Sequence, residues 1–161
     1  MRLVIADTGP VNYLILIGHI DLLPRMFERV VLPAAVQTEL SNSLAPPSVQ
    51  RWITHFPAWL ETVQTPAVTL STGIHKGEAA AIALAAAMQA DLLLIDERRG
   101  IRAAKQQGLR VAGTPGLLDL AAERGLVDFA AAIRKLEGTS FRRPEALPRA
   151  LLDKHQKPDK S

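Results

Sequence analysis

The stretch Asp91-Leu-Leu-Leu-Ile-Asp-Glu-Arg-Arg-Gly-Ile-Arg102 decides the fold, because a short apolar run in it ends abruptly in two acids. The run Leu92 to Ile95 is continuously apolar, which is typical of a parallel strand buried on both faces. Asp96 and Glu97 follow at the point where this strand leaves the sheet. Since open α/β sheets place their chemistry at the carboxyl ends of their strands, Asp96 is the first candidate for a functional site.

The same arrangement occurs at the start of the chain. The segment Arg2-Leu-Val-Ile-Ala6 has the pattern of a buried strand, and it ends in Asp7, followed by Thr8-Gly9-Pro10. Glycine and proline at this position favour a tight turn into a helix, because proline suits the first helical position. We therefore expect a carboxylate and a hydroxyl side by side at a strand-to-helix junction.

Strand and helix patterns alternate along the rest of the chain. Beyond the two strands above, the pattern predicts strands over 30–32, 59–63 and 109–112, and helices over 11–17, 21–27, 33–40, 48–56, 77–89, 98–107, 115–124, 128–137 and 144–153. This alternation predicts an α/β fold with a central parallel β-sheet flanked by helices and joined by right-handed crossovers. We expect the strand after Asp91 to be the central one. Trp52, Phe56 and Trp59 either form an apolar lip for a partner or, as we favour, pack on the core.

The composition is that of one soluble domain. A chain of 161 residues buries a core without disulfides, and the absence of cysteine excludes disulfides, thiolate zinc sites and a cysteine nucleophile. Residues 1–20 lack the order of a signal peptide, and no apolar run approaches the ~20 residues that span a bilayer. We therefore expect a cytoplasmic protein with no membrane contact, divided into a domain at 1–137 and a basic C-terminal helix with a disordered tail at 138–161.

The positive charge of the chain is concentrated near its end. From Gly138 onward there are six Lys and Arg residues against three Asp and Glu, which accounts for the whole net charge of +3. A basic tail near a phosphate-binding face helps to hold a polyanion. A solvated terminus without a ligand explains the same charge equally well, so both interpretations stay open.

Four carboxylates recur at strand ends and helix starts, namely Asp7, Glu39, Glu78 and Asp96. Because these positions converge on one edge of a parallel sheet, the acids would repel one another and raise one another's pKa unless a cation bound them. Oxygen ligands without cysteine or a histidine pair favour Mg²⁺ or Mn²⁺ over zinc. Taken singly, each acid is more typical of a helix cap or a solvated loop than of a metal site, and it is the pattern of four that favours a site. Of the nearby acids, Glu97 is expected to point away and Asp91 to end the preceding turn.

The strings that contain these acids resemble the PIN-domain family. They are Val-Ile-Ala-Asp7-Thr-Gly-Pro, Thr38-Glu39-Leu, Gly77-Glu78-Ala-Ala-Ala-Ile-Ala-Leu-Ala and Leu-Leu-Ile-Asp96-Glu-Arg-Arg-Gly, and they are most similar to a prokaryotic VapC-like branch. The resemblance covers about residues 1–125. It implies a Rossmann-like PIN fold and a Mg²⁺- or Mn²⁺-dependent endoribonuclease. In that case Asp7, Glu78 and Asp96 match the family's metal-binding acids, and Glu39 matches the acid that completes the site.

The resemblance also implies further roles and partners. Thr8 stands beside the first acid, where it is expected to orient Asp7 or the attacking water. A homodimer, an RNA substrate and a small antitoxin partner are expected. Two departures from the family pattern are Glu78, where many toxins have aspartate, and Leu94, where many have a small hydroxyl residue; the longer carboxylate is expected to shift the ion.

Three arginines follow the last acid, at positions 98, 99 and 102. Because Arg98, Arg99 and Arg102 belong to a helix whose first turn borders the expected site, they are candidates for holding phosphates. A solvated basic face is the competing interpretation.

Several other functions are excluded by missing motifs. The chain has no glycine-rich loop with lysine and Ser/Thr, no Gly-x-Gly-x-x-Gly after the first strand, and no second aspartate two residues after Asp7. These absences exclude P-loop nucleotidases, dinucleotide-binding enzymes and dehalogenase-type phosphatases. An RNA-binding or protein-binding PIN fold without turnover stays open beside the nuclease, as does a toxin of a toxin-antitoxin pair.

Overall fold

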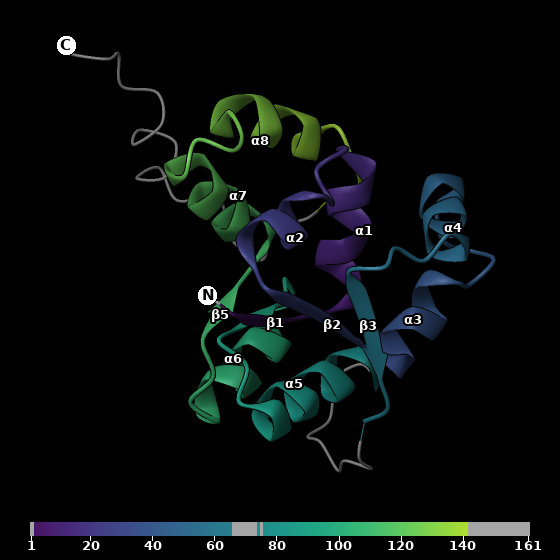
Figure 1. The fold of residues 1–161 in the computed structure, drawn as a ribbon, viewed down its shortest axis with the longest axis vertical. Coiled ribbons are helices and arrows are strands. Elements are labelled where there is room, and N and C mark those ends of the chain that lie inside the picture. Colours follow the sequence, from purple (N-terminus) through teal and green to yellow (C-terminus); the bar gives the residue numbers. More distant parts are fainter. Residues whose placement is uncertain (1, 66–73, 75, 142–161) are drawn as a thin grey trace.

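The computed structural model describes residues 2–65, 74 and 76–141, and within them the backbone forms a parallel sheet with helices on both faces (Figure 1). The strands are β1 (Leu3–Ala6), β2 (Arg29–Pro33), β3 (Leu60–Val63), β4 (Leu92–Leu94) and β5 (Val111–Ala112). Their order is β3-β2-β1-β4-β5, and every pairing is parallel. The expectation that the strand after Asp91 is central is therefore wrong: β1 is central, and β4 lies between β1 and β5.

The pairing of β1 with β4 determines where the first and last acids lie. Ala6 pairs with Leu94, and the Asp7 backbone N–H donates to the Leu94 carbonyl oxygen at 2.9 Å. The two strands consequently end at the same level. Asp7 and Asp96 thus leave the sheet at the same edge, as the sequence predicted.

The helices form two layers around the sheet. In Figure 1, α5 and α6 cover one face, and α1, α2, α7 and α8 cover the other. Their bounds are α1 (Thr8–Leu16), α2 (Leu22–Met26), α3 (Ala34–Leu40), α4 (Pro47–Thr54), α5 (Lys76–Met88), α6 (Arg98–Gln106), α7 (Thr114–Glu123) and α8 (Phe129–Glu137).

Alternate residues of the inner strands supply two separate cores. In β4, Leu92 and Leu94 join the larger cluster, whereas Leu93 and the following Ile95 join the smaller one beneath α5 and α6. Successive side chains of a strand point to opposite faces, so a sheet covered on both faces needs apolar residues at every position. This explains why the strand pattern is continuous rather than alternating.

The three aromatic residues of the α4 region pack on the core, as favoured above. Trp52, Phe56 and Trp59 are partly buried against the larger cluster, and the rings of Trp52 and Trp59 lie 6.0 Å apart between centroids. The helix predicted over 144–153 and the predicted tail that follows it lie outside the described residues.

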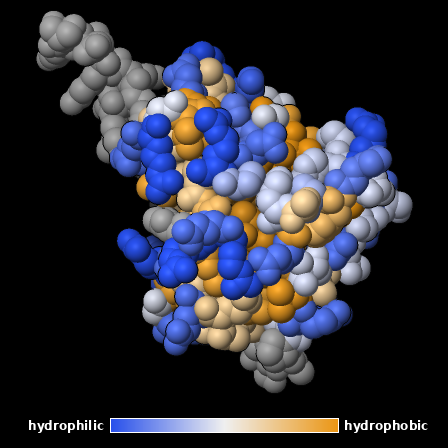
Figure 2. Space-filling view, in the orientation of Figure 1, coloured by the Kyte–Doolittle hydropathy of each residue, from blue (hydrophilic) through white to orange (hydrophobic). Residues whose placement is uncertain are grey.

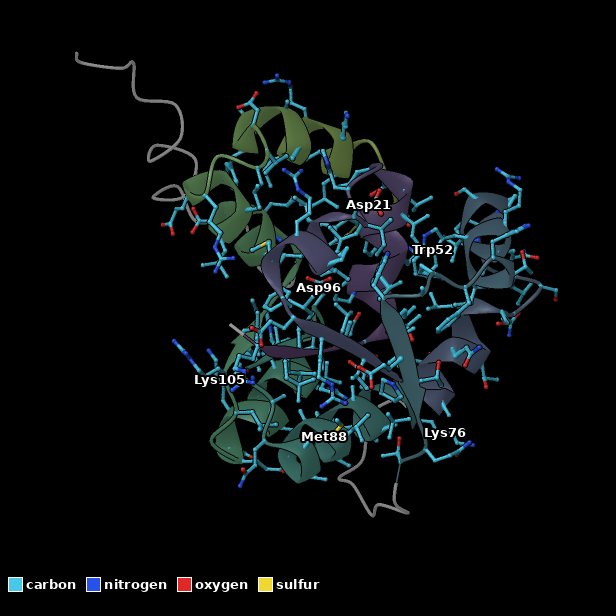
Figure 3. The ribbon with its side chains drawn as sticks, in the orientation of Figure 1. Asp21, Trp52, Lys76, Met88, Asp96 and Lys105 are labelled. Carbon is cyan, nitrogen blue, oxygen red and sulfur yellow. The ribbon has the colours of Figure 1, made fainter. Side chains whose placement is uncertain are left out.

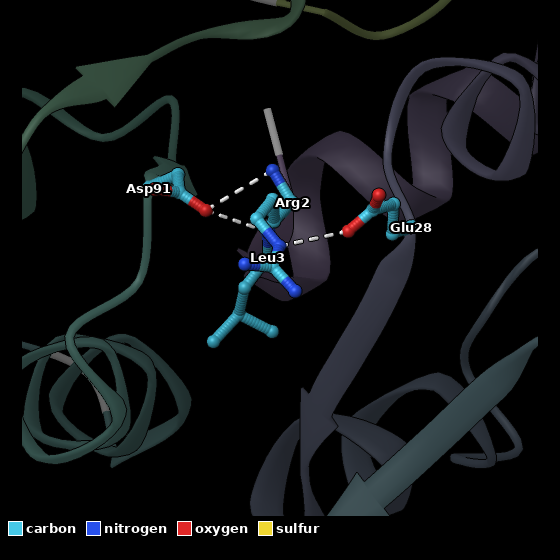
Figure 4. Close-up of polar contacts among 4 residues, drawn as sticks. All are labelled: Arg2, Leu3, Glu28 and Asp91. Atoms are coloured by element: carbon cyan, nitrogen blue, oxygen red, sulfur yellow. Dashed lines mark hydrogen bonds and ion pairs between the residues drawn. The ribbon is translucent and has the colours of Figure 1, made fainter.

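Asp91 has a structural role beyond ending a turn. Its Oδ2 accepts hydrogen bonds from the backbone N–H groups of Leu3 at 2.8 Å and Arg2 at 3.1 Å (Figure 4). These bonds, that of Leu3 first, lower the pKa of Asp91. Asp91 therefore joins the start of β4 to the start of β1, at the edge of the sheet away from Asp7.

The face of the molecule displayed in Figure 2 carries hydrophilic residues over much of its area, with hydrophobic residues visible between them. Among the described residues, no helix has the length and apolar character needed to cross a membrane.

Candidate active site

A pocket of about 350 Å³ lies at the carboxyl ends of β1 and β4. All four acids singled out from the sequence line it, although they come from four different parts of the chain. In the view of Figure 3 the labelled Asp96 lies near the middle of the molecule, whereas the labelled Lys76 and Lys105 lie toward its outline. The lining consists of Asp7, Thr8, Gly9, Asn12, Tyr13, Glu39, Glu78, Asp96, Glu97, Ser140 and Phe141.

Asp7 is buried at the junction of β1 and α1, with 4% of its surface exposed. Burial raises the pKa of Asp7 to about 7; the Thr8 backbone N–H opposes this shift, and the charges of Glu78, Glu39 and Asp96 add to it. Its Oδ1 is buried without a hydrogen-bond partner among the described residues. A buried acceptor in this state is costly unless a proton or a cation satisfies it.

Asp96 is held by Thr114, the first residue of α7. The Thr114 backbone N–H donates to Oδ1 and its hydroxyl donates to Oδ2, each at 2.7 Å. Burial raises the pKa of Asp96, the two bonds from Thr114 oppose that rise, and the charge of Glu97 adds to it. Both oxygens of the carboxylate are therefore fixed in direction while each retains a further lone pair.

Glu39 reaches the pocket from the last turn of α3. The Thr8 hydroxyl donates to its Oε2 at 3.2 Å, and its Oε1 is buried without a hydrogen-bond partner among the described residues. The hydroxyl of Thr8 thus contacts Glu39 and not the predicted partner Asp7. Asp7 accepts a hydrogen bond from the backbone N–H of Thr8.

Glu78 lies in the first turn of α5 and is 5% exposed. Its Oε2 would lie 3.0 Å from a Cβ atom built on Gly100 of α6, and that Cβ would also lie 2.5 Å from the Ile95 Cδ1. A side chain on Gly100 is therefore incompatible with the present position of this acid and of the strand end beside it.

Two more glycines lie against acids of the pocket. A Cβ atom on Gly77 would overlap the carboxylate of Glu39, and one on Gly113 would lie 2.6 Å from Asp96 Oδ1. Glycine thus occurs behind three of the four acids, where α3 meets α5, where α5 meets α6, and before α7. The missing Cβ atoms provide the space in which the carboxylates gather.

The donor set fits a hard divalent cation. It consists of carboxylate oxygens, the ligands that Mg²⁺ and Mn²⁺ prefer, and buried Asp7 Oδ1 and Glu39 Oε1 are acceptors that such an ion would satisfy. Within residues 2–65, 74 and 76–141, no group of three or more acidic or histidine side chains has the arrangement of a preformed metal site. The acids therefore share one pocket without already enclosing an ion.

The start of α6 differs from one expectation and leaves another untested. Glu97 was expected to point away, yet it lines the pocket and its charge raises the pKa of Asp96. Arg98, Arg99 and Arg102 are exposed like Glu97, and none of them lines the pocket, so a phosphate-holding role for them stays a prediction.

Several residues of the site were not predicted from the sequence. Thr114, which does not line the pocket but holds Asp96, had a usable signal, because it follows a strand and a glycine at the same sheet edge as Asp7 and Asp96. Asn12 and Tyr13 lie on α1 shortly after Asp7, and this proximity in sequence was a weaker signal. Ser140 and Phe141 had none, since their contact with Tyr13 joins distant parts of the chain.

Comparisons with known proteins were made on the whole chain. A family model described as DUF3368, PIN domain, matches residues 3–157. Among solved structures, the fold is similar to that of a PilT N-terminus domain protein from the hyperthermophilic archaeon Sulfolobus solfataricus P2. The TM-score is 0.52 and the identity 14%, and the match covers 76% of this chain and 95% of that chain. At this identity the likeness shows the fold alone. A comparison with curated proteins found no significant match.

Proposed function

The chain belongs to the PIN-domain family, and on this premise we propose that it is a divalent-metal-dependent endoribonuclease. Proteins of this family are generally nucleases and typically depend on a divalent metal. The predicted family and its Rossmann-like α/β fold are confirmed, whereas membership of the VapC-like branch stays a prediction. One observation carries the proposal: Asp7, Glu39, Glu78 and Asp96 line a single pocket.

In the proposed site these four carboxylates hold Mg²⁺ or Mn²⁺. When bound, such an ion lowers the pKa of a water molecule and stabilises negative charge on a phosphate. Thr114 fixes the direction of Asp96, and the Thr8 hydroxyl restrains Glu39, so that two of the ligands are oriented before an ion arrives. The chain supplies no cysteine nucleophile, and hydrolysis in this site requires none.

The electrostatics of the acid cluster support a role for the cation. Burial, more than the neighbouring acids, raises the pKa of Asp7 to about 7, so its ionised form is disfavoured, and a divalent ion bound beside it would stabilise that form. A purely structural acid cluster would be stabilised by arginine or lysine side chains, and none from the described part of the chain lines the pocket.

The test is cleavage of single-stranded and structured RNAs by the purified protein with Mg²⁺, Mn²⁺ or EDTA. Asp96→Asn preserves the size of the side chain and removes its charge, and Asp21→Asn is the matched control on an exposed acid. The proposal expects cleavage by the wild type and by the control, no cleavage by Asp96→Asn, and none in EDTA. RNA that stays intact with Mg²⁺ and also with Mn²⁺ would count against the nuclease proposal.

A PIN fold that binds RNA or a protein without turnover is the second proposal, and it rests on the departures from the family pattern at Glu78 and Leu94. It predicts that the wild type retains RNA affinity in EDTA and cleaves nothing with metal.

The proposed biology is that of a cytoplasmic homodimer acting as a toxin with a small antitoxin. Unimpaired growth of cells that express the protein alone would argue against a toxin.

A further inference from the structure

One part of the pocket wall is neutral and aromatic. Tyr13 of α1 and Phe141, which follows α8, lie edge to face, with ring centroids 5.1 Å apart and planes at 89°. The hydroxyls of Tyr13 and Ser140 lie within 3.4 Å of each other. Both aromatic residues line the same pocket as the four acids.

Local hydrogen bonds fix the position of Phe141. After α8 ends, the Thr139 hydroxyl donates to the Leu136 carbonyl oxygen at 2.6 Å and accepts from the Phe141 backbone N–H at 3.1 Å. The ring is half-buried and packs on the larger core cluster. A ring held in this way loses little further freedom when a ligand stacks on it.

Phe141 has open space on more than one side. It lines the acidic pocket and also a neighbouring hollow of about 250 Å³, which it shares with Pro115, Ile133, Leu136 and Glu137. An aromatic ring between two hollows is accessible to a planar ligand that enters from the acidic pocket.

The charges of the pocket show what such a ligand must provide. Five of the lining residues are acids, and no lysine or arginine lines the pocket within the described part of the chain. Apart from an ion held by the acids, the described side chains of the pocket therefore offer no positive charge to the phosphates of a nucleic acid. Uncharged contacts must supply the rest of the affinity for a strand crossing the pocket, and base stacking on an aromatic ring is one such contact.

We propose that Phe141, supported edge-on by Tyr13, is the stacking site for one unpaired base of the RNA strand, next to the acid cluster. The inference rests on the proposed nuclease function, because that function identifies the ligand as a nucleic acid. A base stacked here must be free of its own helix, so the pocket selects single-stranded RNA over duplex RNA. Phe141 is a specificity-determining residue and takes no part in the chemistry.

The experiment measures cleavage and binding with single-stranded oligoribonucleotides that carry one abasic site, moved one position at a time. In the wild type, one abasic position near the cleaved bond should weaken binding roughly 5- to 100-fold, the range of a single stacked base. Phe141→Leu, which keeps an apolar side chain for the core, should lower the affinity for intact RNA by a similar factor. The affinity of Phe141→Leu for RNA should not depend on where the abasic site is placed.

Phe56→Leu is the matched control, because Phe56 is another half-buried aromatic residue on the same core and does not line the pocket. Its affinity for RNA should equal that of the wild type. Equal affinity of Phe141→Leu and the wild type, with the same response to the abasic site, overturns the stacking site. Failure of the nuclease proposal is distinguishable, because there the wild type itself cuts no RNA.

Discussion

Thr114 donates two hydrogen bonds of 2.7 Å to Asp96, one from its backbone N–H to Oδ1 and one from its hydroxyl to Oδ2. The threonine is completely buried, and it begins α7 directly after β5 and Gly113. This pair joins the end of β4 to the start of α7, although the two residues are 18 positions apart in the sequence. The direction of the Asp96 carboxylate is therefore set by a residue outside the acid cluster.

Thr114→Val removes the hydroxyl and keeps both the shape of the side chain and the backbone donor. Because a hydrogen bond to a charged group contributes about 1.5–3 kcal/mol, we expect the free energy of unfolding to fall by about 1–2 kcal/mol. Cleavage should slow about tenfold as Oδ2 loses its direction. Urea denaturation and single-turnover cleavage measure the two effects. Thr114→Ser should restore most of both.

Thr38→Val is the matched control for this variant, since the Thr38 hydroxyl makes an exposed bond to its own helix, to the Ala34 carbonyl oxygen. Its stability should change by less than about 0.5 kcal/mol, as for most surface substitutions. Equal effects of the two substitutions on cleavage would show that the bond between Thr114 and Asp96 does not matter for the site.

Gly77→Ala tests whether the missing Cβ atoms make room for the acids. The new methyl group would overlap the Glu39 carboxylate, so Glu39 must swing away, and we expect cleavage to fall at least tenfold (about 1.4 kcal/mol). Gly116→Ala is the control within another helix, where the added Cβ meets only the Ala112 Cβ at an ordinary 3.5 Å. That variant should be as active as the wild type. If Gly77→Ala cleaved RNA as fast as the wild type, Glu39 would not be a functional residue of the site.

The raised pKa of Asp7 predicts how the metal-free protein responds to pH. The pKa is about 7 in the folded protein against 3.8 for an unperturbed aspartate, so the folded state binds the proton more tightly. The contribution of Asp7 to the free energy of unfolding should therefore be greatest below pH 4, and this contribution should be lost as the pH rises through 7. The loss is on the order of 4 kcal/mol, since each pKa unit is about 1.4 kcal/mol.

Asp7→Asn should abolish that slope, because the amide stays neutral at every pH. In EDTA at pH 8 the variant should consequently be more stable than the wild type, and the two should converge near pH 4. Urea denaturation across this range provides the measurement. A variant that is less stable than the wild type at pH 8 would mean that the ionised carboxylate supports the fold.

The acids could be predicted because two simple rules locate them. Asp7 and Asp96 directly end apolar strands, and parallel strands end at a common edge. Glu78 follows because it opens a helix that packs across the same edge. The order of the strands, in contrast, is not encoded in their composition: β1 and β4 are both wholly apolar, and only the pairing shows that β1 is central.

The remaining errors and omissions have physical causes. Arg98 and Arg99 follow Asp96 closely in sequence, but as the first residues of α6 they lie exposed and do not line the pocket. The contact of Tyr13 with Ser140 spans 127 positions, so no local pattern indicates it. The roles of Gly77, Gly100 and Gly113 were not predicted, because the sequence does not show which carboxylate occupies the space that each glycine leaves.

The central claim is that the four acids share a divalent ion, and titration with Mn²⁺ at pH 8, followed by electron paramagnetic resonance, tests it most directly. The wild type and Asp21→Asn should bind at least one ion, and Asp7→Asn and Asp96→Asn should lose it or bind it at least tenfold more weakly. If the wild type binds no Mn²⁺, or if Asp7→Asn binds it as tightly as the wild type, the acid cluster is not a metal site.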